Sequence, residues 1–313
     1  MSWSVLRLGT RRSPMAMAQS GAVARLVTQR TGVRVELVGL TSFGDISQAD
    51  LTQIGGTGVF VSALRTCLLA GDVDIAVHSL KDLPTADLPG ITLAAVPARE
   101  DPRDALVARD GAKLADLPTG ARIGTGSPRR AAQLRLLRPD TRPVAVRGNA
   151  GTRLAKVASG ELDAVVLAYA GLARIGHIDL VTEIFEPDEM VPAPGQGALA
   201  VECGDTDPDL AALLGSVDDP ATRAAVTAER AVLAELGAGC HAPVGAYGTV
   251  AGQLDLTAVV IGGDGGPAVA ASAGGPPAEA AKIGQQAARE LLRRGAGRYL
   301  TVSTAHTSNG DDA

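Results

Sequence analysis

The chain has 313 residues, of which 46% are hydrophobic and only 2% aromatic, and its formal net charge at pH 7 is −5. This length and apolar content exclude a disordered chain and predict two or three folded domains. The scarcity of aromatic side chains argues against a protein that binds single-stranded nucleic acid, because such proteins stack bases on aromatic rings.

Short β-branched runs alternate with helical stretches in the first part of the chain. Because this βαβ alternation is typical of parallel sheets covered by helices, it predicts an α/β domain. We expect strands at residues 5–9, 34–38 and 74–77 and helices at about 14–29 and 58–69.

The same alternation returns between about residues 122 and 174, with apolar runs at 144–146 and 164–167. Proline-rich joints at 97–102 and 191–195 bound this second region, and proline and glycine punctuate elements and stiffen connectors. We therefore expect two similar α/β domains that are connected by two crossings of the chain.

The remainder of the chain predicts a return to the first domain and then a third unit. We expect the run 198–203 to be a strand of the first sheet and a helix at about 220–236 to open the third unit. Strands and a helix at about 278–294 complete that unit. The stretch 262–277 is rich in Gly, Pro and Ala and indicates a loose turn, and residues 303–313 indicate a frayed tail.

Cysteine spacing and hydropathy indicate in which cellular compartment the protein works. Cys67, Cys203 and Cys240 form no Cys-x-x-Cys pair, which argues against a disulfide framework and against a metal site. No apolar run is long enough for a signal peptide or a membrane span. We therefore expect reduced thiols in a cytoplasmic protein that has no membrane partner and binds no metal.

An aspartate follows the third expected strand. The run 74–77 continues into His78-Ser79-Leu80-Lys81-Asp82, and ligands of open parallel sheets bind beyond the carboxyl ends of the strands. Asp82 is therefore a candidate for chemistry. An ordinary surface pair of Lys81 and Asp82 and a core position for His78 are the alternative interpretations.

Residues 122–156 carry eight arginines and one lysine against a single acid, which gives this segment a net charge of +8 inside an acidic protein. Two turns within it, 124–130 and 147–153, combine glycine, Ser or Asn, and arginine, and lead into expected helices. Backbone N–H groups, the helix dipole and guanidinium groups together bind carboxylates or phosphates. A solvated basic face and an RNA-binding face are the alternatives, whereas the missing Gly-Lys-Ser/Thr ending argues against a nucleotide loop.

Cys240 stands in a glycine-rich loop, Gly237-Ala238-Gly239-Cys240, after the long expected helix. An accessible thiol of this kind becomes a nucleophile when its pKa is lowered. Cys67 within an apolar helical run and Cys203 at a strand end are typical of core positions. A structural role for Cys240 is the alternative interpretation.

These segments together resemble the porphobilinogen deaminase (hydroxymethylbilane synthase) family from near residue 5 to about residue 300, and after Tyr247 the similarity is one of fold only. One departure is Thr57, where many members of the family carry lysine. The motifs that carry the resemblance come in the family's order and at its spacing: residues 10–14, 54–60, 74–82, 100–104, 125–130, 147–149, 194–198 and 239–240.

The resemblance implies two α/β domains similar to periplasmic ligand-binding proteins, residues 1–97 plus 200–217 and residues 98–199, and a smaller α+β domain, 218–313. It also implies a monomeric transferase of tetrapyrrole biosynthesis. This transferase condenses four porphobilinogen molecules head to tail, releases ammonia at each addition and frees hydroxymethylbilane with water. Its cofactor is a dipyrromethane joined to Cys240 by a thioether, and its other ligands are porphobilinogen and the growing oligopyrrole, which is a polyanion.

Motif positions carry the family's functional residues over to this chain. Asp82 is implied as the catalytic carboxylate, which stabilises the cationic azafulvene left by the loss of ammonia and assists proton movement. Residues 43–58 are implied as a mobile lid. The remaining assignments are Cys240, Lys81, Asp82, Thr125, Ser127, Arg129, Arg130, Arg147 and Gly148 for the cofactor, and Arg11, Ser13, Arg147, Arg153, Arg174 and Gln196 for the substrate.

Two other classes of protein stay open on the residues alone. The first is a binding protein without turnover that captures a small anion. The missing export signal argues against it, and so does Asp82, because a negative group in an anion cleft is costly unless chemistry needs it. The second is an RNA or DNA binder that uses residues 122–156, and the few aromatic residues argue against it.

Overall fold

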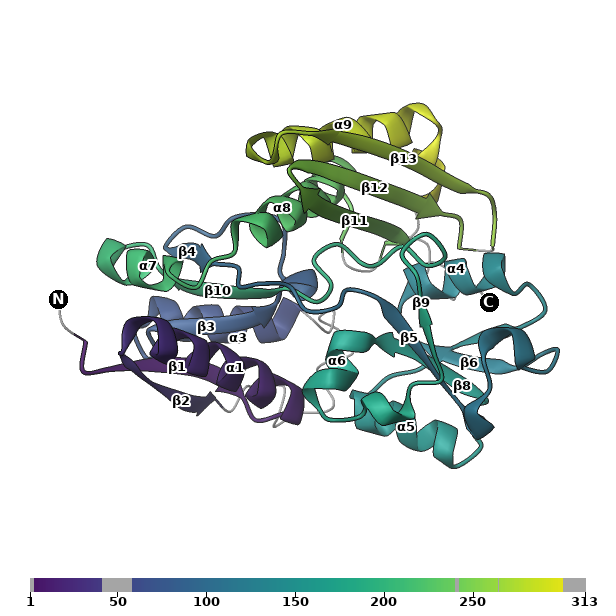
Figure 1. Ribbon diagram of the computed structural model, residues 1–313, viewed down its shortest axis with the longest axis horizontal. Coiled ribbons are helices and arrows are strands. Elements are labelled where there is room, and N and C mark those ends of the chain that lie inside the picture. The colour runs from purple at the N-terminus through teal and green to yellow at the C-terminus, as the bar shows by residue number, and fades with distance from the viewer. Residues whose placement is uncertain (1–2, 41–57, 240–241, 264, 301–313) are drawn as a thin grey trace, which may run out of the picture.

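In a computed structural model of the chain, the structure describes residues 3–40, 58–239, 242–263 and 265–300. Three β-sheets organise this part of the chain, two of five strands and one of three, and helices pack against each sheet (Figure 1). The expected fold class, two α/β domains with a smaller α+β domain, is confirmed. None of the helices in these ranges is long and apolar enough to cross a membrane.

The first sheet mixes parallel and antiparallel pairs. Its strands are β1 (Val5–Arg11), β2 (Arg34–Leu40), β3 (Ile75–Ser79), β4 (Ile91–Ala95) and β10 (Leu199–Gly204). In the order β2-β1-β3-β10-β4, the first three pair in parallel, and β10 runs antiparallel to both of its neighbours. The expected return of the chain to the first sheet is therefore confirmed.

Three helices cover the first sheet: α1 (Pro14–Thr31), α3 (Gly58–Leu69) and α7 (Pro208–Gly215). α1 begins where the Ser13 hydroxyl accepts a hydrogen bond from the Ala16 N–H, and it ends at Gly32, whose φ of 74° supplies a left-handed turn. Apolar side chains of α1, α7 and the strands form one core, which includes Leu6, Leu8, Val23, Val27, Ile75, Val201, Cys203 and Leu214.

The second sheet has the same architecture. Its strands are β5 (Asp104–Ala108), β6 (Arg122–Thr125), β7 (Arg142–Ala145), β8 (Ala164–Ala168) and β9 (Glu183–Phe185). In the order β7-β6-β8-β5-β9, the first three are parallel and β5 is antiparallel to its neighbours. The helices of this domain are α4 (Pro128–Leu137), α5 (Ala150–Ala158) and α6 (Tyr169–Arg174).

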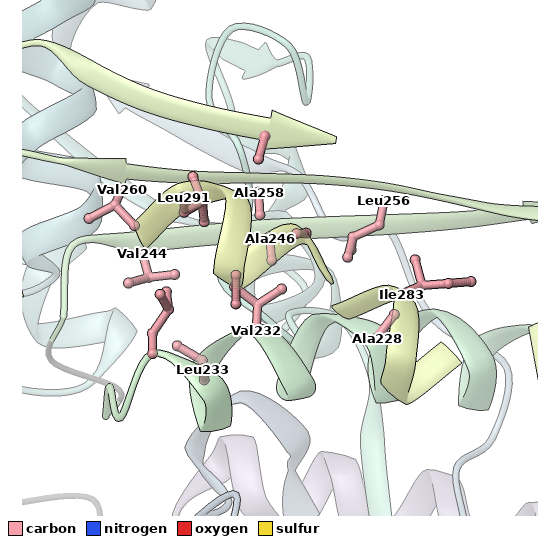
Figure 2. Close-up of a cluster of buried hydrophobic side chains, with 14 of the residues drawn as sticks. Ala228, Val232, Leu233, Val244, Ala246, Leu256, Ala258, Val260, Ile283 and Leu291 are labelled. Carbon is pink, nitrogen blue, oxygen red and sulfur yellow. The ribbon is translucent and has the colours of Figure 1, made fainter. Parts of the chain in front are cut away.

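The third sheet is an antiparallel meander of β11 (Val244–Ala251), β12 (Gln253–Ile261) and β13 (Ala268–Gly275). α8 (Pro220–Glu235) and α9 (Ala280–Arg293) pack on one face of it, and Figure 2 shows the core between them. The two helices approach so closely that a Cβ at Gly284 would clash with the Ala228 carbonyl oxygen. In Figure 1 this unit lies above the other two domains.

The expectation of a loose turn at 262–277 is wrong, because β13 occupies residues 268–275 of that stretch. Every residue of β13 is in register with β12, from Ala268 opposite Ile261 to Gly275 opposite Leu254. Val269 and Ala271 are buried in the core of the third domain. Pairing along a whole neighbouring strand outweighs the weak strand propensity of Ala and Gly, which is set largely by context.

Two crossings connect the first and second domains, one between β4 and β5 and one between β9 and β10, as the proline-rich joints predict. They lie against each other, since the Glu100 N–H donates a hydrogen bond to the Gly197 carbonyl oxygen at 3.3 Å. The domain bounds given above stay a prediction. The described 3₁₀ turns are η2 (Leu80–Asp82), η3 (Arg109–Gly111), η4 (Leu114–Asp116), η5 (Ile178–Leu180), η6 (Pro277–Glu279) and η7 (Ala296–Tyr299).

Candidate active site

A cleft of about 670 Å³ lies between the first two domains. Its walls come from α1, β3 and η2 on one side and from α5, β8 and α6 on the other. The structure brings together in this cleft eight of the residues predicted from the sequence: Arg11, Ser13, Lys81, Asp82, Arg130, Gly148, Arg153 and Arg174.

Asp82 is the acidic residue among those that line the cleft. It closes η2, the turn that directly follows β3, and the Leu80 N–H fixes this turn to the Ala198 carbonyl oxygen of the second crossing at 3.0 Å. Within the described ranges, the Asp82 carboxylate forms no hydrogen bond or ion pair. The Asp82 carboxylate is thus accessible to a ligand in a cleft whose other charged side chains are cations.

The Lys81 ammonium lies next to Asp82 in the same turn and donates a hydrogen bond to Gln196 Oε1 at 3.3 Å. Burial and the positive charge of Arg130 lower the pKa of Lys81 to about 8, although the charge of Asp82 acts in the opposite direction. The positive charges of Arg130 and Arg129 both lower the pKa of Lys81, so binding of an anionic ligand, which offsets these charges, will favour the charged form of the lysine.

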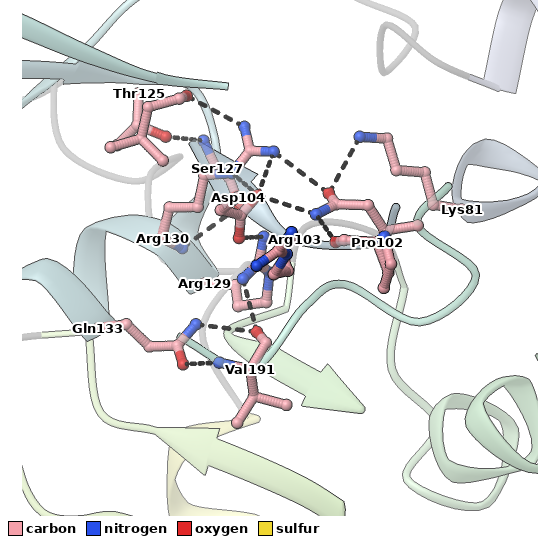
Figure 3. A network of polar contacts seen from close by, with 12 residues as sticks. Lys81, Pro102, Arg103, Asp104, Thr125, Ser127, Arg129, Arg130, Gln133 and Val191 are labelled. Atoms are coloured by element: carbon pink, nitrogen blue, oxygen red, sulfur yellow. Dashed lines mark hydrogen bonds and ion pairs between the residues drawn. The ribbon is translucent and has the colours of Figure 1, made fainter. Parts of the chain in front are cut away.

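Gln196 lies in the second crossing and is completely buried. Its Oε1 also accepts from Arg130 at 3.2 Å, and its Nε2 donates to the Pro102 carbonyl oxygen at 2.6 Å and to Asp104 at 2.9 Å (Figure 3). Gln196 does not line the cleft. Its role in substrate binding therefore stays a prediction, whereas its contacts join both crossings to the second domain.

Asp104, at the start of β5, holds the two adjacent arginines of α4. Its carboxylate lies 2.7 Å from Arg129 and 2.7 Å from Arg130, and all three side chains are buried. Burial alone would raise the pKa of Asp104, yet the charges of both arginines lower it to about 2. Arg130 lines the cleft, but Arg129 does not and instead donates to the Val191 carbonyl oxygen at 2.6 Å.

The N-terminus of α5 lines the cleft through Gly148, Asn149, Ala150 and Gly151, whereas α4 contributes Arg130 to the lining. Ser127 caps α4 and Asn149 caps α5, each through a side-chain oxygen that accepts a backbone N–H. Gly148 has a φ of 99°, and a Cβ there would lie 2.9 Å from the Thr152 side chain, so the turn requires glycine. Such helix ends favour anions because N–H groups and the dipole point outward.

Of the other predicted cofactor contacts, Thr125, Ser127 and Arg147 do not line the cleft. The Thr125 hydroxyl accepts a hydrogen bond from the Ser127 N–H at 3.1 Å and thereby shapes the turn before α4. Arg147 is exposed and forms no hydrogen bond or ion pair with the described residues. Its guanidinium is therefore available to a ligand.

Two of the arginines that line the cleft, Arg153 and Arg174, are held by backbone carbonyl oxygens or by an acidic side chain. Arg153 donates to the Gly148 carbonyl oxygen at 2.9 Å, and burial lowers its pKa. Arg174 donates to the Gly197 carbonyl oxygen at 3.0 Å and lies 2.9 Å from Glu100. Both guanidinium groups are thus oriented before any ligand enters.

Several cleft residues were not predicted from the sequence. Gln19 donates to the Ser79 hydroxyl at 2.7 Å, and its spacing of four residues from Met15 on a helix is a signal that could have found it. His177 also lines the cleft, and no sequence signal marked it. His78 is buried and lies 3.1 Å from Glu202, so the core interpretation holds, although His78 also borders the cleft.

The cysteines separate into two groups. Cys203 is completely buried, and burial raises its pKa to about 11. Burial likewise raises the pKa of the partly buried Cys67. Neither is an activated nucleophile. The structure does not test three of the predictions. Cys240, Thr57 and residues 43–57 of the expected lid lie outside the described residues, and Gly58, the last residue of that lid, is the first residue of α3.

Two family models match the chain. The model of the porphobilinogen deaminase dipyromethane cofactor binding domain matches residues 6–212, and the model of the porphobilinogen deaminase C-terminal domain matches residues 223–293. The chain is 59% identical to the porphobilinogen deaminase of Thermobifida fusca, over 97% of this chain and 98% of that protein. It is 56% identical to porphobilinogen deaminase 1 of Streptomyces coelicolor, over 95% and 97%.

Solved structures overlap with part of the chain. A periplasmic substrate-binding protein of an ABC transporter from Coxiella burnetii covers 70% of this chain, with a TM-score of 0.43 and 16% identity. The fold described above rests on the strand orders of the chain and not on this overlap. The two family models and the full-length identity show that the chain belongs to the porphobilinogen deaminase family.

Proposed function

We propose that this protein is a hydroxymethylbilane synthase, a transferase that condenses four porphobilinogen molecules head to tail with release of ammonia. The observation that carries the proposal is the Asp82 carboxylate, which has no hydrogen-bond or ion-pair partner among the described residues, in a cleft lined by Arg11, Lys81, Arg130, Arg153 and Arg174. Such a cleft matches substrates that carry acetate and propionate arms and become cationic at one ring during reaction.

The described residues fit a dipyrromethane with four carboxylate arms. Guanidinium groups and the N-terminus of α5 offer donors, and Arg147, next to Gly148, forms no hydrogen bond or ion pair with the described residues. When bound, this cofactor supplies the pyrrole carbon to which the first substrate unit is joined. We assign its thioether link to Cys240, which follows α8 in the chain.

Asp82 is assigned two tasks in each addition. As the carbon–nitrogen bond of the substrate breaks and ammonia leaves, positive charge develops on the substrate's pyrrole ring, and the carboxylate stabilises that charge. Asp82 then accepts the proton that the newly joined carbon loses when the ring regains aromaticity. The surrounding cations hold the carboxylate arms and orient the ring beside Asp82.

Lys81 and the arginines bind rather than react. With a pKa of about 8, Lys81 is already largely protonated at pH 7, and an approaching carboxylate arm raises this pKa further. Arg153 and Arg174 are already oriented by backbone carbonyl oxygens. This preorganisation lowers the entropy that an incoming arm must lose.

The same proposal covers the setting of the protein. We place the reaction in the cytoplasm and expect a monomer that binds no nucleic acid. Residues 122–156 support the last point, because Arg122, Arg138 and Lys156 pair with acids of the chain and Arg129 and Arg130 are buried. A binding protein without turnover would leave unexplained why the Asp82 carboxylate lies in a cleft that otherwise suits anions.

The test combines mass and turnover. The wild type and Cys240→Ser are purified in parallel, their intact masses are measured under denaturing conditions, and formation of hydroxymethylbilane from porphobilinogen is followed. The expected result is one dipyrromethane of excess mass on the wild type, none on Cys240→Ser, and product from the wild type alone. A wild type that forms no product even after incubation with preformed bilane would overturn the proposal.

A further inference from the structure

A side chain of the third domain reaches the turn that carries Asp82. Arg230 of α8 donates hydrogen bonds to the carbonyl oxygens of Pro84 at 2.7 Å, Leu83 at 2.9 Å and Leu80 at 3.4 Å. Asp82 lies between Leu80 and Leu83 in the chain. The guanidinium therefore holds the backbone on both sides of this residue.

Besides Arg230, the backbone around Asp82 is held by the Leu80 N–H, which binds the Ala198 carbonyl oxygen, and by the buried side chains of Leu80 and Leu83. β3 ends at Ser79, and η2 is a single turn closed by the Leu83 N–H and the Leu80 carbonyl oxygen at 3.1 Å. Pro84 then removes one backbone donor from the chain. A single 3₁₀ turn fixes its own backbone with few hydrogen bonds, so its geometry depends on contacts with other elements.

Arginine is suited to this position by its shape. A planar guanidinium offers five donors in a fixed fork, whereas the lysine ammonium is a compact point charge, so only arginine meets three separated carbonyl oxygens. Burial lowers the pKa of Arg230, and no carboxylate within the described ranges forms an ion pair with it. Its charge is directed at the backbone of the Asp82 turn.

The helix that carries Arg230 is itself fixed to the crossings. The neighbouring Glu229 is completely buried, pairs with Arg99 of the first crossing at 2.6 Å and accepts the Gly195 N–H of the second crossing at 2.6 Å. The Gly248 N–H of β11 donates to the same carboxylate at 2.8 Å. α8 is thus a rigid support from which Arg230 extends.

We propose that Arg230 is a positioning residue for the Asp82 carboxylate, acting from the third domain. This inference rests on the catalytic role proposed above for Asp82. Arg230 does not line the cleft. It acts by keeping the turn in place, because catalytic groups must be held within about 0.5 Å of the productive geometry.

The first test compares two arginines of the same helix. Arg230→Gln removes the fork, and Arg223→Gln is the matched control, because Arg223 binds Asp218 and the carbonyl oxygens of β4, away from Asp82. We express kcat per molecule of enzyme that carries the cofactor. For Arg230→Gln we expect this kcat to fall by up to about 100-fold, while KM stays within about twofold of the wild-type value. Arg223→Gln keeps the wild-type kcat, and Arg230→Lys recovers part of the loss. A wild-type kcat in loaded Arg230→Gln would overturn the inference.

A double-mutant cycle separates positioning from a general loss of structure. In the Asp82→Asn background there is no carboxylate to position, so Arg230→Gln should change the residual rate by less than about twofold. If the two losses multiply in full, Arg230 acts by another route and the inference fails.

Hydrogen–deuterium exchange supplies a readout that does not depend on turnover. We expect faster exchange at the Leu83 N–H in Arg230→Gln than in the wild type and in Arg223→Gln, because the turn loses its outer support. Unchanged exchange would overturn the inference. An inactive wild type would instead contradict the proposed function, while the exchange result still reports on the turn.

Discussion

The Lys81 ammonium donates a hydrogen bond to the side chain of Gln196, 3.3 Å away, and so connects the turn that carries Asp82 to the second crossing. The same amide of Gln196 binds Asp104 and Arg130 of the second domain. The side chains that bind a ligand in the cleft and those that join the two domains therefore belong to one network. Substitutions within it affect both stability and catalysis, and the predictions below separate the two.

Asp82→Asn tests the catalytic carboxylate. Because the amide keeps the shape and loses the charge, we expect normal folding and cofactor mass and a fall in kcat of at least about 100-fold. Asp87→Asn is the control, since Asp87 is exposed and outside the cleft. Steady-state kinetics with porphobilinogen measures both variants, and a near-normal kcat for Asp82→Asn would assign the chemistry to another group.

The titration of Lys81 tests the electrostatics of the cleft. With a pKa lowered to about 8, chiefly by burial, Lys81 should lose its proton well below the value of a free lysine, about 10.4. Isotope-labelled reductive methylation and NMR between pH 6 and pH 11 follow it. Because the charge of Asp82 raises this pKa, Asp82→Asn should move the midpoint further down. A midpoint at the value of free lysine would contradict the buried environment.

Asp104 predicts a loss of stability in acid. Its folded-state pKa, about 2, lies below the unfolded value of about 3.9, so its stabilisation is complete above about pH 4 and is lost as the pH falls through 2. The difference between the two pKa values corresponds to about 2–3 kcal/mol. Urea unfolding of the wild type between pH 5 and pH 2 should show this decline.

Asp104→Asn leaves two buried guanidinium groups without their carboxylate, and we expect it to cost about 3–5 kcal/mol at pH 7. The decline between pH 4 and pH 2 should be shallower in this variant than in the wild type. Asp140→Asn is the control, because its partner Arg138 lies at the surface and such pairs contribute little. Equal midpoints for Asp104→Asn and the wild type would show that the buried pair contributes nothing.

Arg129→Leu and Arg147→Leu should differ in what they damage. Arg147 is exposed, so Arg147→Leu should stay within about 0.5 kcal/mol of wild-type stability while cofactor loading or chain growth falls. Arg129 is buried against Asp104 and the Val191 carbonyl oxygen, so Arg129→Leu should lose about 3 kcal/mol. Urea unfolding and intact mass measure the two effects. A stable, fully loaded Arg129→Leu would contradict this division.

Local patterns predicted much of the fold. The helices at Pro14 and Gly58 and the strands around Val5 and Ala164 follow from periodicity and from caps such as Ser13. β13 was missed because its Ala and Gly residues become a strand only through pairing with β12. β4 and β9 were missed because short edge strands carry almost no periodic signal.

The candidate site was predicted in its residues more than in its connections. Turn chemistry and strand ends located Asp82, Ser127 and Gly148. The pairing of Arg129 and Arg130 with Asp104 could not be predicted, because it joins segments that only the second sheet brings together. The contacts of Arg230 with the Asp82 turn are invisible in the sequence for the same reason, since they connect two domains.

The position of β10 sets an order in which the domains can mature on the ribosome. β4 pairs only with β10 in the described sheet, so the first domain lacks a partner for its edge until residues 199–204 have been synthesised. The second sheet uses strands from 104 to 185 alone and is complete earlier. We therefore expect the second domain to complete its sheet before the first domain, whose synthesis began earlier, receives β10.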